Sequence, residues 1–339
     1  MTSTPSPGET ADQTQTPASA AAPAPRRNLW LTLFTLALAA LLLYLALRGV
    51  DWRAFLGTIS RGRYYLLPFL FILVSLNYFV RALRWRVLLS ADRPIPPLTV
   101  FWANMAGYLG NSFLPARAGE LVRSLALGHK AAIDASFVLA TALTERLLDV
   151  IALVLISALA LLSMPGISPA FANALQGMAV LAGVGLLFVL LAPRFSLFFQ
   201  RLLAALPFPA SLRPRLESLL SRFLDGMRSL QDFRRLAFFV ALTAFVWIVD
   251  GLGTMLGAYM LRLHLTLPQA LLLLAGLGLS SAIPSTPGYV GVYQFVAVTM
   301  LSPFGFSKSD ALAYILVAQA FNYVIVTVWG LPGLLLSRK

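Results

Sequence analysis

Residues 107–119 read GYLGNSFLPARAG, and residues 276–288 read GLGLSSAIPSTPG. These two strings matter most for the fold, because they lie 169 residues apart, close to half of the 339-residue chain. The offset superimposes four pairs: Gly107 on Gly276, Ser112 on Ser281, Pro115 on Pro284 and Gly119 on Gly288. The chain holds 23 Gly and 21 Pro, so a match this short can also arise by chance. The strings suggest an internal repeat that needs independent support.

Each string lies inside a longer apolar stretch, at 98–127 and 268–301. Proline removes a helical hydrogen bond and clashes with the preceding turn, and glycine lowers helix propensity. We therefore expect both stretches to be broken, either as re-entrant hairpins or as discontinuous helices. The residues expected to form these structural breaks are Gly107, Pro115, Gly119, Gly276, Pro284, Pro287 and Gly288.

Six further apolar runs surround the broken stretches, at 29–47, 64–80, 135–164, 173–192, 236–261 and 311–336. Each has about 17 residues or more, which is enough to cross a hydrocarbon core of roughly 30 Å. The sequence predicts an all-α polytopic membrane protein with about six full spans and two broken segments. The segment 1–27, rich in Thr, Ser, Ala and Pro, is expected to be a disordered cytoplasmic tail before a membrane domain at 28–339.

The composition points the same way. Hydrophobic residues make up 59% of the chain and charged residues only 12%, where a soluble domain has roughly 25% charged. This excludes a soluble enzyme, a nucleic-acid-binding protein and a secreted disulfide scaffold. The chain has no cysteine and two histidines, so no metal site and no cofactor are expected, and any catalysis would depend on carboxylates.

The net charge of +13 is distributed unevenly. If the broken segments return to the side they enter from, 19 basic residues lie on one side of the membrane and six on the other, with Arg146 inside a span. This asymmetry predicts a multi-pass cell-membrane protein with both termini cytoplasmic. If both segments crossed fully, the Arg-rich segment 194–235 would instead face outward. That segment is expected to form cytoplasmic amphipathic helices on anionic lipid.

The order of segments supports the repeat. The halves 28–164 and 173–336 each contain two spans, a broken segment and a third span. Three spans is an odd number, so the two halves would be inverted in the membrane. Interrupted segments at matching positions of inverted halves are typical of transporters and mark the substrate site. Irregular backbone survives at membrane depth only where protein or a wet cavity covers it.

Four strings carry a family resemblance: RALRWRVLL (81–89), GYLGNSFLPARAGELVRSLAL (107–127), TERLLDVIALV (144–154) and IPSTPGYVGVYQF (283–295). With them the chain resembles the flippase-like membrane domain of lysylphosphatidylglycerol synthase. The resemblance implies an integral membrane protein that moves a lipid between leaflets. In two-domain members a soluble domain transfers an amino acid to phosphatidylglycerol. This chain ends at Lys339, so we expect a stand-alone member without that synthase domain.

Charged residues in apolar spans are the first candidates for a substrate site. Inserting each such charge into the middle of the membrane costs about 2.5–3.5 kcal/mol, so a charge kept there is expected to have a function. Glu145, Arg146 and Asp149 share one apolar run, with the two carboxylates four residues apart on one helix face. If the helix starts at Ala135, this cluster lies near the middle of the membrane. If the span is 147–164, the cluster is an interfacial ion pair. Asp250 is the sole charge in its span and should either meet an arginine or stay protonated.

Arg117, Glu120 and Arg123 follow the first break. The two arginines could hold a phosphate, with Glu120 orienting one of them, or all three could be a solvated helix end. Arg84 belongs to a basic cluster at the end of the second span. That cluster is either a headgroup contact or an interfacial anchor.

The second break offers hydroxyl groups, chiefly those of Ser281 and Tyr289, to a headgroup or to freed backbone groups. Gln294, Gln319 and Asn322 are expected to form interhelical hydrogen bonds.

The favoured function is a lipid flippase that moves an anionic or modified phospholipid, or a polyprenyl-linked lipid, between leaflets. Its expected partners are membrane phospholipids and no nucleic acid. One alternative is an integral-membrane glycosyl or aminoacyl transferase, although the chain has no DxD motif. The other is a non-transporting partner of such a lipid-modifying enzyme.

Overall fold

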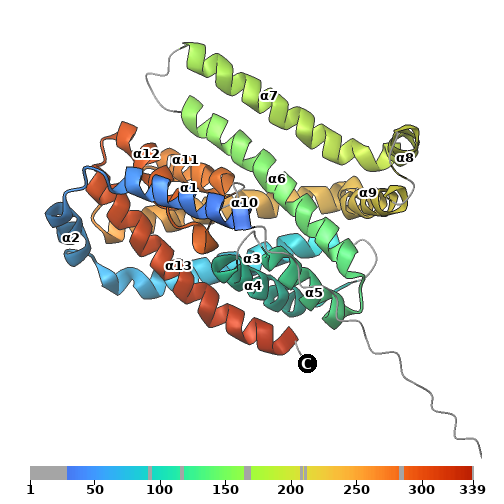
Figure 1. Cartoon of the computed structure of the whole chain (residues 1–339), viewed down its shortest axis with the longest axis horizontal. Coiled ribbons are helices and arrows are strands. Elements are labelled where there is room, and N and C mark those ends of the chain that lie inside the picture. Colours follow the sequence, from blue (N-terminus) through green and yellow to red (C-terminus); the bar gives the residue numbers. More distant parts are fainter. Residues whose placement is uncertain are drawn as a thin grey trace, which may run out of the picture.

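The computed structural model describes residues 29–337 except 91–93, 115–117, 164–168, 207–208, 210–211 and 282–285. Within these residues every regular element is a helix (Figure 1). The α-helices are α1 Leu29–Leu47, α2 Trp52–Ser60, α3 Leu67–Leu89, α4 Pro97–Phe113, α5 Gly119–Ala131, α6 Ala135–Leu162, α7 Pro169–Leu191, α8 Ser196–Ala205, α9 Arg213–Arg228, α10 Phe233–Met260, α11 Leu267–Ser280, α12 Val292–Leu301 and α13 Lys308–Ser337. Short 3-10 helices join them: η1 Tyr64–Leu66, η3 Ala192–Phe195, η4 Ser229–Gln231, η5 Pro287–Tyr289 and η6 Ser302–Phe304. The all-α class is confirmed.

Four helical stretches of the described chain are long and apolar enough to cross a membrane: Tyr64–Leu89, Ala179–Ala205, Phe233–Met260 and Lys308–Leu336. The number of candidate spans rises to five if α1 and α2, which are bent by 86° against each other, count as one span. α6 has 28 residues, but three charges near its middle interrupt its apolar character. The predicted count of six full spans therefore stays a prediction, although a helix lies at each of the six predicted positions.

The first broken segment forms two helices, α4 and α5, that pack against each other. Gly119 lies so close to α4 that an added Cβ would overlap the carbonyl oxygen of Gly107. Gly110 packs against Gly119 in the same way. Glycine is therefore required here because the two backbones touch. The predicted Pro115 break lies outside the described residues.

The second broken segment is made of α11, η5 and α12, with α11 and α12 packed together. Gly276 supports this contact, since a Cβ there would press on Val296 and Met300 of α12. Pro287 begins η5, and Gly288 has a positive φ of 67°, which favours glycine. The predicted Pro284 break lies outside the part of the chain that the structure describes.

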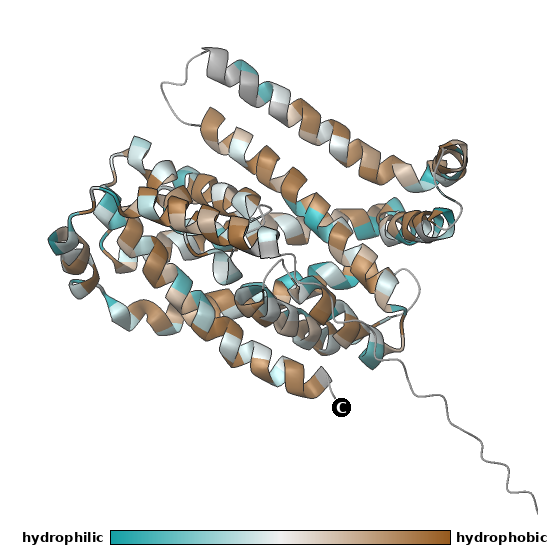
Figure 2. Ribbon diagram, viewed as in Figure 1, coloured by the Kyte–Doolittle hydropathy of each residue, from teal (hydrophilic) through white to brown (hydrophobic). Residues whose placement is uncertain are grey.

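α7 runs along α6 at the edge of the molecule, and α8 and α9 gather at one end of this pair (Figure 1). After Gln176, α7 contains only glycine and apolar residues, and large side chains on it are exposed: Val180, Leu181, Val184, Leu187 and Phe188. Figure 2 shows mainly hydrophobic ribbon along the long helices, with a hydrophilic stretch midway along α6. An apolar exposed surface of this kind suits a lipid surrounding.

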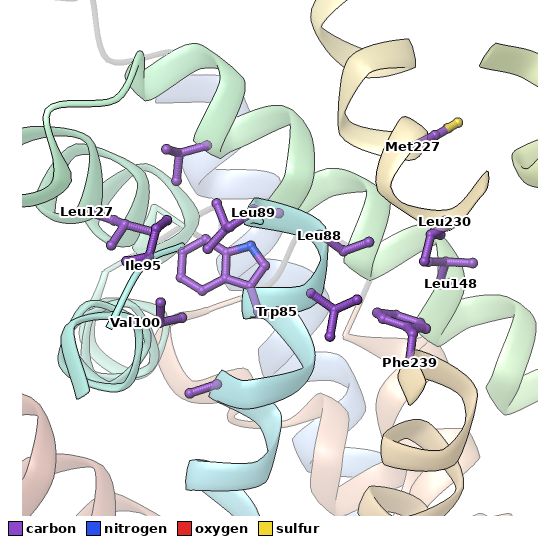
Figure 3. Packing of buried hydrophobic residues seen from close by; sticks show 14 of the residues in the cluster. Trp85, Leu88, Leu89, Ile95, Val100, Leu127, Leu148, Met227, Leu230 and Phe239 are labelled. Atoms are coloured by element: carbon purple, nitrogen blue, oxygen red, sulfur yellow. The ribbon is translucent and has the colours of Figure 1, made fainter. Parts of the chain in front are cut away.

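Among the described residues, Trp85 of α3 is the largest side chain that is fully buried. Its Nε1–H donates a hydrogen bond to the Thr141 hydroxyl of α6 at 3.2 Å. Figure 3 shows it at the centre of the packed residues Leu88, Leu89, Ile95, Val100, Leu127, Leu148, Met227, Leu230 and Phe239. This core fixes α3 against α4, α5, α6, α9 and α10, and so fixes the end of α3 that carries Arg81 and Arg84.

Candidate functional site

α6 supplies the first charged residues of the site. The helix begins at Ala135, where its predicted apolar run begins, and Asp134 caps it by accepting the backbone N–H of Ser136 at 2.9 Å. Glu145 lies ten residues further along, about 15 Å from the start. Asp149 follows one turn later on the same face, and both carboxylates are buried, at 2% and 7% exposed. Buried charges of this kind must be paired.

Two arginines from other helices pair with these carboxylates. Arg84 of α3 lies 3.0 Å from Glu145 and 2.6 Å from Asp149. Arg123 of α5 lies 3.0 Å from the other oxygen of Glu145. Both guanidinium groups are about 1% exposed. Glu145 therefore joins three helices, because one carboxylate accepts from two arginines on separate elements.

Arg123 has further partners that fill its surroundings. It lies 2.6 Å from Glu120 and donates to the Asn104 side-chain oxygen at 2.9 Å. Its guanidinium also stacks over the Trp85 ring, 4.4 Å from the centroid. The structure therefore places Arg123 inside the protein packing.

Arg146 of α6 completes the first charged cluster. It lies 2.8 Å from Glu120 and 3.8 Å from Asp149. Its side chain is 32% exposed, far more than Arg84 or Arg123. The cluster contains three arginines and three carboxylates, so its formal charges balance. Arg146 is the member with room to meet a ligand.

A second charged pair joins α3 to α10. Arg81 pairs with Asp250, and the Asn77 side-chain amide donates to the same carboxylate at 2.5 Å. Arg81 also lies over the Trp247 ring, 5.4 Å from its centroid. Of the two alternatives expected for Asp250, the structure therefore shows the one in which it meets an arginine. The arginine is 13% exposed, and the carboxylate 21%.

Both charged groups border one partly open cavity of about 440 Å³. Its polar wall includes Asn77, Tyr78, Arg81, Tyr108, Asn111, Ser112, Glu120, Arg146, Asp149 and Asp250. Its apolar wall includes Leu70, Leu73, Val74, Leu153, Leu274, Leu277 and Ile315. Both broken segments contribute, the first through Asn111 and Glu120 and the second through Leu277 and Tyr289. The cavity therefore offers charge and hydrocarbon-like surface in one space.

The predicted site and break residues fall into four groups. Those that line the cavity are Glu120, Arg146, Asp149, Asp250, Ser281, Gly288 and Tyr289. Those buried behind it are Arg84, Arg123 and Glu145, which pair with the lining residues or with each other. Arg117, Pro115 and Pro284 lie outside the described residues. Gly107, Gly119 and Gly276 support the packing of the broken segments.

The cavity residues that sequence reasoning missed include Tyr78, Arg81 and Tyr108. Tyr78 and Tyr108 lie 5.1 Å apart between ring centroids, and the Tyr78 hydroxyl donates to the Asn322 side-chain oxygen at 2.6 Å. A usable signal exists for Arg81, because Asn77, Arg81 and Arg84 recur at helical spacing on one stripe of α3. The tyrosines carry no such signal, since aromatic residues are common in apolar helices.

Amide side chains hold the far wall of the cavity. Gln294 of α12 donates to Gln319 of α13 at 2.6 Å, and Gln319 donates to the Gly288 carbonyl at 2.5 Å. Together with the Tyr78 to Asn322 bond, these contacts confirm the predicted interhelical hydrogen bonds. They also give one freed carbonyl of η5 a partner, as irregular backbone in a membrane requires.

The fold and the cavity define a multi-pass α-helical membrane protein with a charged internal cavity. The chain belongs to the family described as "Lysylphosphatidylglycerol synthase TM region", whose model matches residues 32–330. Comparison with curated proteins and with solved structures gave no match. Family membership indicates a role connected with membrane lipids.

Proposed function

We propose that this protein moves a phospholipid between the two leaflets of a membrane, with the lipid headgroup in the polar part of the central cavity. The observation that carries the proposal is the cavity itself. It combines partly exposed arginines and carboxylates with a leucine-rich wall, and both broken segments line it. Ligand pockets typically have 300–1,000 Å³, so the volume suits a headgroup and the start of its acyl chains.

Arg81 and Arg146 are the proposed phosphate contacts. Both are partly exposed and border the cavity, and a guanidinium matches phosphate oxygens with two parallel donors. Their present partners, Asp250 and Glu120, would then be free to hold a positively charged part of the headgroup. The site therefore suits an anionic phospholipid or one modified with an amine.

Arg84, Arg123 and Glu145 have a positioning role in this proposal. They are buried and paired, and they hold α3, α5 and α6 at the distances at which Arg146 and Asp149 reach the cavity. Removal of one member leaves an unpaired buried charge rather than a missing ligand contact.

The two broken segments would gate the cavity in turn. If the halves 28–164 and 173–336 are inverted repeats, α4–α5 and α11–α12 open toward opposite leaflets. Rocking of one half against the other would expose the headgroup site to each side alternately. The sequence contains no ATP-binding motif, so movement would be passive or coupled to an ion.

The test is a flipping assay with the full chain in liposomes that carry fluorescent phosphatidylglycerol. Dithionite bleaching from outside measures how fast inner-leaflet lipid reaches the surface. We expect acceleration by the wild type and at least tenfold slower flipping by Arg146→Gln, with Arg228→Gln as the matched control. Arg228 is 62% exposed and its ion pair lies on α9, away from the cavity. No acceleration with any phospholipid would contradict the proposal.

A chemical assay separates flipping from lipid modification. Lipid extracts from cells with and without the protein would differ in composition if the chain were a transferase. A flippase changes only the leaflet in which a lipid resides.

A further inference from the structure

We infer that the protein has a second lipid site, distinct from the central cavity, where the ends of α3 and α10 hold the phosphate of an anionic phospholipid. A separate pocket of about 300 Å³ lies there. It is lined by Leu83, Arg86, Val87, Ser90, Arg234, Arg235 and Phe238. None of these residues borders the central cavity.

The two helices that form this pocket are both long enough to cross a membrane, and they pack side by side. α3 ends at Leu89 and α10 begins at Phe233, so the pocket lies at one membrane-facing end of the pair. Three arginines gather there, one from α3 and two from the first turn of α10. Basic pockets between membrane-spanning helices are suited to lipid headgroups.

Within the described part of the chain, none of the three guanidinium groups lies within ion-pair distance of a carboxylate. Arg86 donates to the Ile95 carbonyl at 2.5 Å, and Arg235 donates to the Ser90 carbonyl at 3.2 Å. Among the residues that the structure describes, no acidic side chain forms an ion pair with Arg86, Arg234 or Arg235. The pocket therefore differs from the central cavity, where the arginine charges are balanced.

Asp232 accepts the backbone N–H of Arg235 at 3.0 Å and caps α10. Counted over the described residues, three arginines line the pocket and one capping carboxylate lies beside it, so their summed charge is positive. Cations in the first turn of a helix oppose its dipole, so Arg234 and Arg235 do not stabilise α10. A bound anion would account for their placement.

The apolar part of the pocket favours a lipid over a free phosphate. Phe238 is 54% exposed, and Phe233 at the start of the same helix is 81% exposed. Leu83 and Val87 line the pocket on the α3 side. An acyl chain can lie along these residues while the phosphate meets the arginines, whereas a free phosphate gains nothing from them.

The test is a lipid titration of the full chain in detergent, followed by native mass spectrometry, with phosphatidylglycerol and phosphatidylcholine as probes. We expect preferential phosphatidylglycerol binding and a roughly tenfold weaker first binding step in Arg234→Gln/Arg235→Gln. The matched control is Arg194→Gln/Arg201→Gln, which removes the same charge from two exposed arginines on η3 and α8. Equal weakening in both double variants would overturn the inference, because it would indicate general charge attraction.

A competition experiment and a further variant distinguish a lipid from a water-soluble ligand. Competition by inorganic phosphate or glycerophosphoglycerol at millimolar concentration would show a water-soluble ligand and would also overturn the lipid site. Phe238→Ala should weaken phosphatidylglycerol binding while leaving the thermal midpoint in phosphatidylcholine unchanged. Unaltered phosphatidylglycerol binding in Phe238→Ala would contradict the proposed acyl-chain contact. If the double variant fails to fold, the single Arg234→Gln replaces it, since Arg234 is exposed.

Discussion

Glu145 is held by two guanidinium groups that come from different helices, Arg84 from α3 and Arg123 from α5. Such a carboxylate stabilises the packing only while all three charges are present. If the glutamate is neutralised, two buried arginines lose a counter-charge. At the scale of single residues, the charged cluster therefore holds α3, α5 and α6 together and also forms part of the cavity wall.

Glu145→Gln should lower the free energy of unfolding by about 3 kcal/mol or more, because breaking a buried ion pair leaves uncompensated charge. Glu217→Gln is the matched control, since Glu217 is exposed and forms no ion pair among the described residues. Unfolding by sodium dodecyl sulfate, followed by circular dichroism, measures both. Equal stability of the two variants would show that the ion pairs of Glu145 do not hold the three helices together.

The sequence alone identified many of these residues. Glu145, Arg146, Asp149 and Asp250 stand out because apolar spans exclude charge. Their pairing was not predictable from sequence, since Arg84 is 61 residues from Glu145 and Arg81 is 169 from Asp250. Only the packing of α3 between α6 and α10 decides which arginine faces which carboxylate.

At the scale of elements, the first broken segment depends on the contact between Gly119 and Gly107. The hairpin brings Glu120 and Arg123 to the charged cluster. The sequence predicted the break from its glycines and prolines, and the charge asymmetry favoured a segment that returns to its own side of the membrane. α4 and α5 pack against each other as a hairpin, while the side from which they enter the membrane stays a prediction.

Gly119→Ala should destabilise the protein by about 1–3 kcal/mol, because the new methyl group meets backbone that cannot move aside. Gly183→Ala on α7 is the control. A Cβ there meets open space, so helix propensity should make this change neutral or stabilising by about 0.5–1 kcal/mol. Thermal midpoints in detergent compare the two. A stable Gly119→Ala variant would contradict the close approach of α4 and α5.

The start of α6 gives a pH-dependent prediction. Hydrogen bonds from the Ser136 hydroxyl and N–H, with a contribution from Arg222, hold the pKa of Asp134 below its usual value. Because the pKa is lower in the folded state, the ionised carboxylate stabilises the fold at any pH above the pKa of the unfolded chain, about 3.9. This stabilisation is lost as the pH falls through the pKa of the folded state. Asp134→Ala should therefore cost about 1 kcal/mol at pH 7 and less below pH 4.

Asp134→Asn separates the cap from the charge. The amide oxygen can still accept the Ser136 N–H, so most of the stability at pH 7 should remain while the acid dependence becomes weaker. Thermal midpoints between pH 3 and pH 7 measure this. An unchanged acid dependence in both variants would assign it to other carboxylates.

At the scale of the whole molecule, α2 and α9 lie at opposite ends of the long axis (Figure 1). The charge distribution predicts that α9 lies on the cytoplasmic side with both termini. The chain has no cysteine, so single cysteines report sidedness directly. Ser60→Cys should react with an impermeant maleimide from outside intact cells, and Glu217→Cys only after lysis. Labelling of both from the same side would contradict the predicted topology.

A helix lies at each of the six apolar runs that the sequence predicted as spans, because span length and hydrophobicity are local properties. The sequence could not predict the cavity, which arises where α3, α6, α10 and α13 meet. Tyr78 and Tyr108 illustrate the limit, since nothing local distinguishes a tyrosine at a cavity wall from one in a packed core.

A substitution that fills the cavity and leaves the fold intact tests whether lipid passes through it. Gly253 of α10 lines the cavity, and the nearest atoms to a Cβ there are Leu73 and Leu70 at 3.8 and 4.0 Å. Gly253→Phe should therefore fold and occupy the lipid space, whereas Gly183→Phe places the same ring on the exposed face of α7. In liposomes with fluorescent phosphatidylglycerol, we predict at least tenfold slower flipping by Gly253→Phe and wild-type flipping by Gly183→Phe. Wild-type flipping by a folded Gly253→Phe variant would contradict a lipid path through this cavity.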